Sequence, residues 1–111
     1  MLEVPDRELI SDDGGRRIGV WAVSSLATDA GGWRSINRIG LPMIPPLFAQ
    51  YNEDLGNRLN AGRPSEDFAT YGKSVINDVA GAVAANGTAG DPEAYAVKVA
   101  HRILPNILPY T

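Results

Sequence analysis

The stretch "WRSINRIGLPMIPP", residues 33–46, marks the point where the periodicity of the chain changes. Its first seven residues predict a polar strand, and the glycine and three prolines that follow end the extended run. Strand-like patterns precede this stretch, and apolar residues at helical spacing follow it. We therefore predict an α+β fold, in which a small antiparallel sheet of two to three strands from the N-terminal half packs against about three helices from the C-terminal half.

The N-terminal half contains the predicted strands and turns. Residues 17–25, "RIGVWAVSS", are apolar on both faces and predict a central strand. Residues 2–5, "LEVP", predict a shorter extended run, and "SDDGG" at 11–15 is rich in turn-forming residues, so we expect a hairpin between the two runs. A second turn at 28–32, "TDAGG", leads to the third strand at 33–39.

The C-terminal half predicts three helices. The first starts at Pro46, which suits a first helical turn, and ends near Gly56. Residues 57–64, "NRLNAGRP", are interpreted as a linker, and the second helix runs from Ser65 to 86. The third starts at Asp91, whose side chain suits a cap, and ends at Pro105. The apolar faces of the last two helices are Phe68, Tyr71, Val75, Ile76, Val79 and Val83, and Val97, Ala100 and Leu104 with Tyr95, Val99 and Ile103 beside them.

Composition limits the classes of function. At 111 residues the chain suits one domain, so residues 1–111 are treated as a single domain. The chain has no cysteine, which excludes disulfides, thiol catalysis and thiolate metal sites. The formal net charge is −3 and the basic residues are scattered, so no nucleic-acid partner is expected. The apolar runs are far shorter than the ~20 residues that span a bilayer, so membrane insertion is not expected.

Four short motifs follow one another in an order found in a known family. They are "LEVP" at 2–5, "GVWAVSS" at 19–25, "INRIGLP" at 36–42 and "ILPNILPYT" at 103–111. In these motifs the chain resembles the C-terminal part of the DUF4331 family, which comprises large bacterial proteins of undefined function. The resemblance implies a bacterial source and either a fragment or a stand-alone version of that part, and it implies no known reaction.

The chain departs from the family pattern in two places. Pro45 stands where members carry an asparagine, which removes any role of that amide, and the family's N-terminal "SHREAP"-like segment is absent. Full-length relatives suggest export in bacteria, but no signal-peptide pattern opens this chain, so its compartment stays open.

The stretch at 33–46 also holds the candidate site. Arg34, Asn37 and Arg38 together suggest binding of an anion or a carboxylate, since arginine offers a planar fork of donors. The interpretation we prefer is a structural joint, in which Arg38 ties down carbonyls or a carboxylate where the strand meets the helix. Gly40 then supplies an unusual backbone conformation, and the prolines stiffen the crossing. The residues assigned to this joint are Trp21, Gly40, Pro42 and Pro46.

Other candidates carry weaker patterns. His101 is the only histidine, and a structural role is expected for it, with Glu93 two turns earlier. Asp12 and Asp13 lack the spacing of a calcium loop and are expected to be solvated turn residues. We expect no metal, no cofactor and no catalytic residue. The four aromatic side chains expected to pack in the core are Trp21, Trp33, Tyr51 and Tyr71.

These patterns favour a non-catalytic structural or ligand-binding domain of a bacterial DUF4331-like protein. The alternative is an enzyme or enzyme fragment whose site combines Arg38 with Asp12 or Asp13. Self-association, or packing against the rest of a larger protein, is also expected, because a part of a larger fold leaves apolar surface unburied. No ligand is indicated by the sequence.

Overall fold

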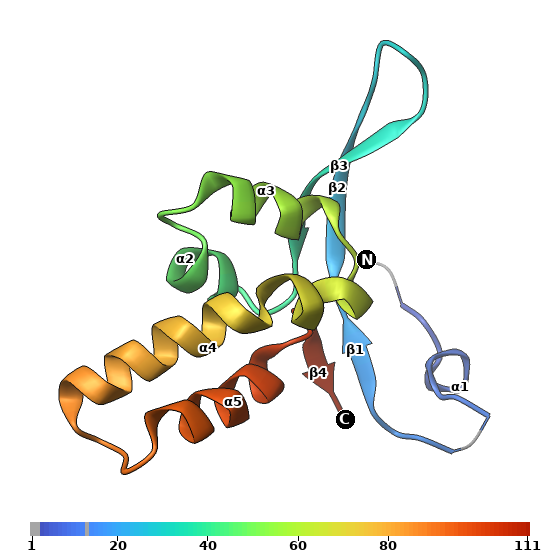
Figure 1. The fold of residues 1–111 in the computed structure, drawn as a ribbon. Coiled ribbons are helices and arrows are strands. Elements are labelled where there is room, and N and C mark those ends of the chain that lie inside the picture. The colour runs from blue at the N-terminus through green and yellow to red at the C-terminus, as the bar shows by residue number, and fades with distance from the viewer. Residues whose placement is uncertain (1–2, 13) are drawn as a thin grey trace.

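The computed structural model describes residues 3–12 and 14–111, and it confirms the predicted α+β class (Figure 1). Strands occupy the N-terminal half and helices the C-terminal half. The elements in chain order are α1 (Asp6–Leu9), β1 (Ile18–Val20), β2 (Ala22–Ala27), β3 (Trp33–Ile39), α2 (Ile44–Phe48), α3 (Glu53–Ala61), the 3-10 turn η1 (Pro64–Glu66), α4 (Asp67–Asn86), α5 (Pro92–Ile103) and β4 (Leu108–Tyr110).

The strands form two separate antiparallel pairs, β2 with β3 and β1 with β4. The predicted hairpin between residues 2–5 and 17–25 is therefore wrong: residues 3–5 form no strand, and residue 2 lies outside the described residues. Pro5 instead precedes the short helix α1, whose first turn carries Asp6 and Glu8, where acidic side chains are favourable. The true partner of β1 comes from the far end of the chain, which no local pattern indicates.

The predicted central strand at 17–25 is also wrong, since it breaks at Trp21 into β1 and β2 and every residue of β2 is exposed. In Figure 1 the β2–β3 hairpin projects away from the helices. Three of the four aromatic side chains expected in the core lie outside it: Trp21 is 49% exposed, Trp33 78% and Tyr51 94%. Trp21 and Trp33 belong to the hairpin region, where every residue of β2 is exposed, and Tyr51 lies in the turn between α2 and α3.

The region predicted as one helix from Pro46 to near Gly56 forms two helices, α2 and α3, and its outer ends also differ from the prediction. Helix α2 starts two residues before Pro46, which still lies in its first turn. The expected linker at 57–64 is wrong for most of its length, because α3 continues to Ala61. Asn52 makes this possible: its side chain accepts a hydrogen bond from the Leu55 N–H at 3.0 Å and so caps the new helix.

The last two helices follow the prediction closely. Helix α4 ends at Gly87, which adopts the left-handed conformation with φ 61°, and Asp91 caps α5 by accepting from the Ala94 N–H at 2.9 Å. The two helices pack side by side and run antiparallel (Figure 1). Of the expected buried face of α5, Ala100 and Leu104 are buried, and Ala96 is buried in place of Val97, because small side chains let the helices approach closely.

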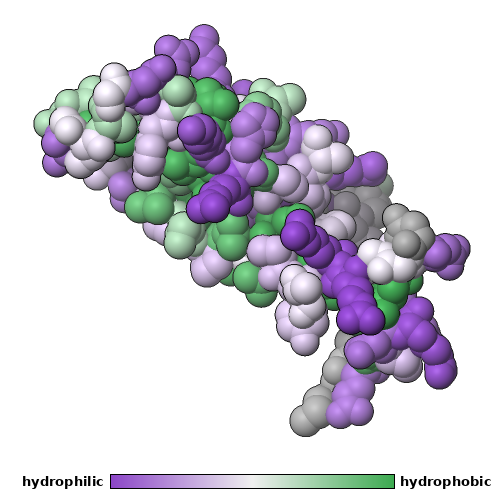
Figure 2. Space-filling model, turned by 90° about the horizontal axis from the view of Figure 1, so that it is seen from below, coloured by the Kyte–Doolittle hydropathy of each residue, from purple (hydrophilic) through white to green (hydrophobic). Residues whose placement is uncertain are grey.

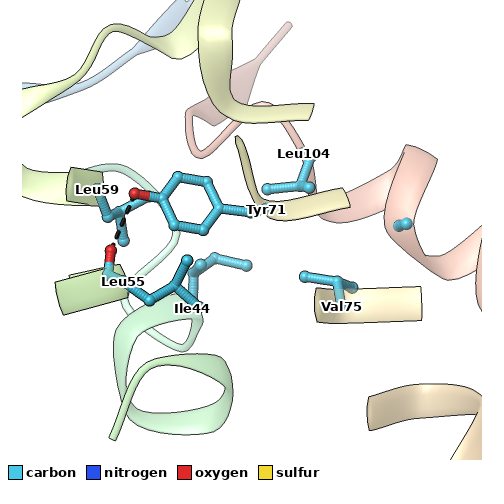
Figure 3. Close-up of a cluster of buried hydrophobic side chains, with 7 residues drawn as sticks. Ile44, Leu55, Leu59, Tyr71, Val75 and Leu104 are labelled. Carbon is cyan, nitrogen blue, oxygen red and sulfur yellow. Dashed lines mark hydrogen bonds between the residues drawn. The ribbon is translucent and has the colours of Figure 1, made fainter. Parts of the chain in front are cut away.

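The hydrophobic core lies among the helices (Figure 3). Its buried members come from α2, α3, α4, α5 and the residue after α5, and they are Ile44, Leu55, Leu59, Tyr71, Val75, Ala100 and Leu104. Tyr71 is the polar member, and its hydroxyl donates to the Leu55 carbonyl at 3.0 Å, so its burial leaves no unpaired phenol. The core thus joins α3 to α4.

Gly40 is required for space rather than for backbone conformation. The glycines with positive φ among the described residues are Gly14, Gly31, Gly32 and Gly87, so the expected unusual conformation of Gly40 is wrong in that respect. A Cβ on Gly40 would overlap the carbonyl group of Asn106 and lie 2.7 Å from the Ile107 Cα. The segment after β3 therefore passes directly against the backbone of the C-terminal segment.

We predict that Gly40→Val lowers the free energy of unfolding by about 1–3 kcal/mol or more, since the neighbouring atoms are backbone and cannot rotate away. Urea denaturation measures the change. The control is Gly81→Ala in α4, where an added Cβ meets no atom within 4 Å. That change is expected to stabilise by about 0.5–1 kcal/mol, as helical alanine does. A neutral Gly40→Val variant would contradict the close approach.

Candidate functional site

Arg38, near the end of β3, is the centre of a buried polar cluster. Its side chain is 1% exposed, and so is that of Asp67, the first residue of α4. The guanidinium Nη1 donates to Asp67 Oδ2 at 3.0 Å and Nη2 donates to Asp67 Oδ1 at 2.5 Å. The Nε–H donates to the Leu59 carbonyl at 2.9 Å. All three nitrogens of the guanidinium are therefore bonded within the protein.

A β-bulge aims Arg38 into the interior. The register pairs Ser25 with Ser35 and Val23 with Arg38, so β3 carries one extra residue between them. Because Val23 and Ser25 lie two apart in a regular strand, their partners Ser35 and Arg38 point to the same face. Both reach α3: the Ser35 hydroxyl donates to the Asn60 carbonyl at 2.7 Å, and the Arg38 N–H donates to Asn60 Oδ1 at 3.2 Å.

The C-terminal segment completes the cluster through Asn106, which is fully buried. Its backbone N–H donates to Asp67 Oδ2 at 2.8 Å, and its Oδ1 accepts from the Leu41 N–H at 2.7 Å. Asp67 thus accepts three hydrogen bonds. The Nδ2 of Asn106 has no hydrogen-bond partner among the described residues. One cluster therefore links β3, α3, α4 and the segment that leads to β4.

The predicted binding trio does not come together. Asn37 pairs with Ser24, one position along β2 from the partner of Arg38, and so points to the opposite face. Arg34 is exposed and borders a shallow hollow that Ser35, Asn57 and Asn60 also line. A single ligand therefore cannot meet all three side chains from one side of the sheet.

The residues assigned to the joint lie at different points of the crossing. Trp21 separates β1 from β2, Gly40 packs against Asn106, and Pro42 is exposed between β3 and α2. Pro46 lies on the exposed side of the first turn of α2.

The weaker candidates lie apart from this cluster. The His101 ring stacks on Phe68 with the ring centroids 4.4 Å apart, which joins α5 to α4. Asp12 is exposed and is not among the groups that Arg38 contacts, and Asp13 lies outside the described residues. In the part of the chain that the structure describes, no group of three or more His, Asp or Glu side chains is placed to hold a metal ion.

Sequence reasoning missed the partners of Arg38. The sequence analysis identified none of Asp67, Asn60 and Asn106 as a partner of Arg38. One signal lay in the two neighbouring acidic residues before the helix. The Oε2 of Glu66 accepts from the Arg63 N–H at 3.2 Å and caps that turn, so the Asp67 carboxylate is available for a different bond. The other contacts could not be predicted because the partners lie far apart in the chain. Asp67 is 29 residues from Arg38, and Asn106 is 65 residues from Leu41.

Comparison with known proteins adds no assignment: no family model, no curated protein and no solved structure matches the chain. Among the helices of the described residues, none has the length and apolar character needed to cross a membrane.

We predict that Arg38→Met destabilises the fold by about 3–5 kcal/mol, because the carboxylate of Asp67 is left buried without its countercharge. The exposed Arg34→Met on the same strand is the control and should cost no more than about 0.5 kcal/mol. The double variant Arg38→Met with Asp67→Leu is expected to be more stable than Arg38→Met alone. Denaturant unfolding of the four proteins tests this, and equal losses for Arg34→Met and Arg38→Met would contradict it.

Tyr71 titrates unusually high. Burial raises the pKa of Tyr71 from its ordinary 10.0 to about 12, and the Asp67 carboxylate adds to the rise while Arg38 and Arg58 oppose it. Because the folded pKa exceeds the unfolded one, the unfolded chain loses this proton first as the pH rises. The stabilisation by the neutral phenol is complete below about pH 10 and is lost between about pH 10 and pH 12.

We predict that Tyr71→Phe removes this part of the alkaline loss of stability. At pH 8 the variant should be less stable than the native protein by about 1 kcal/mol, since the hydrogen bond to the Leu55 carbonyl is gone. The difference should shrink as the pH rises through the interval from 10 to 12. Tyr51→Phe, at a fully solvated position, is the control and should keep the native pH dependence. Parallel curves for Tyr71→Phe and the native protein would contradict the shifted pKa.

Proposed function

We propose that this chain is a non-catalytic structural domain that works through contacts with other protein surface. The observation that carries the proposal is the state of Arg38: its three guanidinium nitrogens all donate to Leu59 and Asp67 in a buried setting. An arginine used in this way holds the sheet against the helices, and a ligand would have to displace its own protein partners. The exposed apolar strands then supply the surface for contact.

The same proposal extends to the family. We propose that the chain is a bacterial DUF4331-like domain, and the placing of three of its four motifs supports this. "GVWAVSS" spans the junction of β1 with β2, "INRIGLP" carries Arg38 and Gly40, and "ILPNILPYT" carries Asn106 and β4. Motifs that lie far apart in the chain thus supply groups that pack against one another, which is what a shared structural role requires.

Ligand binding is the second candidate, and one observation favours it. The hollow beside Arg34 has the amide side chains of Asn57 and Asn60 in its wall, a set of donors suited to a small anion or carboxylate. The hollow is open, and Arg34 has no buried neighbour that fixes it there, so the structural role is the better supported of the two.

We predict that phosphate, acetate, citrate, glucose, calcium and magnesium leave the thermal unfolding midpoint of the protein unchanged. A ligand at 100 times its Kd would add about 2.7 kcal/mol and raise the midpoint by several degrees. Differential scanning fluorimetry at millimolar ligand measures this. A rise with one ligand that Arg34→Ala abolishes would replace the structural proposal by ligand binding in the hollow.

A further inference from the structure

The chain exposes more surface than a folded monomer of its mass needs. Its accessible surface is 8421 Å², whereas a folded monomer of 11.8 kDa exposes about 5,900 Å². Its radius of gyration is 16.8 Å against about 13 Å for a compact domain of ~100 residues. The excess is about 2,500 Å² per chain, or about 5,000 Å² for two copies, which is at the upper end of the total area that obligate homodimers bury. Apolar residues remain visible between polar ones on the face in Figure 2.

Much of the uncovered apolar surface belongs to one small sheet. The large apolar side chains of β2, β3 and the Trp21 junction that are at least two-fifths exposed are Trp21, Val23, Leu26, Trp33, Ile36 and Ile39. An isolated two-stranded sheet is marginally stable in water, and it needs further strands or packing against a helix for independent stability. Helix α3 packs against β3, and a further strand along β2 would stabilise the sheet more.

The two edges of this sheet differ in the described residues. Helix α3 covers the outer edge of β3 at Arg38, where the Asn60 side chain accepts from the Arg38 N–H, whereas every residue of β2 is exposed. That contact also shows which backbone groups of β2 point to its free edge. The Arg38 N–H points away from β2, so Arg38 and Val23 form a non-hydrogen-bonded pair. The N–H and C=O of Val23 therefore point away from β3. By alternation, Val23, Ser25 and Ala27 offer their N–H and C=O groups at the free edge of β2. The bulge lies in β3, so this edge is regular.

We propose that a second copy of this chain pairs antiparallel with β2 across a two-fold axis, which gives a continuous four-stranded sheet. The inference rests on the proposed structural function and names its partner. A strand that meets its own copy brings like residues close to one another, and a charged strand would repel itself. Residues 18–27, "IGVWAVSSLA", carry no charge and no proline, although exposed edges normally carry such residues to prevent pairing.

The two-fold axis limits the register, and we centre it on Ser24, the midpoint of the outward-facing residues from Trp21 to Ala27. Residues that lie opposite each other on neighbouring strands point to the same side of the sheet. Two strands related by an exact two-fold axis must therefore place one residue opposite its own copy. Centring the pair on Ser24 sets Val23 opposite Ser25 of the copy and Trp21 opposite Ala27 of the copy. All of the outward backbone groups of β2 then find partners. The two Ser24 residues form a non-hydrogen-bonded pair with Cα atoms about 4.5 Å apart, a separation that a disulfide can span.

Single cysteines test this register, because the native chain has none. Mild oxidation of Ser24→Cys should give a covalent dimer in high yield. Ser25→Cys, one residue along the same strand, and Thr88→Cys, exposed in the α4–α5 loop, should stay largely uncrosslinked. Equal crosslinking of Thr88→Cys, or none of Ser24→Cys, would overturn the pairing.

Solution mass supplies the independent readout. Light scattering of the native protein at about 100 μM should give close to twice 11.8 kDa. Ser24→Lys, which sets two like charges at the axis, should give a folded monomer with the helical circular dichroism unchanged, and Thr88→Lys should remain a dimer. If the native protein is a monomer and no ligand shifts its thermal unfolding midpoint, the dimer is wrong and the proposed structural function is retained. If a ligand shifts the midpoint, the proposed structural function is wrong.

Discussion

The fold depends on the buried ion pair between Arg38 and Asp67. Removing two charges from water is costly, and the cost is offset only where geometry and further hydrogen bonds are good. Here the Asp67 carboxylate accepts hydrogen bonds from Nη1 and Nη2 of Arg38 and from the N–H of Asn106. The Nε–H of Arg38 donates to the Leu59 carbonyl. The pair thus ties β3 to α3, to α4 and to the segment that leads to β4.

The uncovered sheet follows from the same arrangement. The bulge in β3 turns Ser35 and Arg38 toward α3, which uses that face and edge of the strand. Helices α4 and α5 pack on each other and on the core around Tyr71 and Val75, and every residue of β2 is exposed. The N-terminal half of the chain therefore keeps its apolar residues at the surface. A protein built in this way is suited to complete its core with another protein surface.

Part of the candidate site was predictable. The density of glycine and proline after Arg38 correctly indicated where the strand ends and the helical half begins. The bonds of Arg38 were not predictable, because its partners lie 21 and 29 residues away and on other elements. Likewise, the sequence suggested that Gly40 supplies an unusual backbone conformation. The structure requires glycine there for a different reason, because the backbone of Asn106 and Ile107 passes too close for any side chain. Periodicity carries information on local conformation and none on which distant backbone lies alongside.

By itself, the sequence determined the local structure of the protein. The α+β class, the β3 strand, the C-terminal cap of α4, the N-terminal cap of α5 and the first turn of α2 follow from periodicity and capping, which act within a few residues. The cap expected at Ser65 does not form, since α4 starts at Asp67. Tertiary structure alone decided that β1 pairs with β4, that β2 lies at an open edge and that Arg38 is buried on Asp67. The reason is physical: strand pairing and ion pairing join groups far apart in the chain, and their geometry is set by how the helices pack.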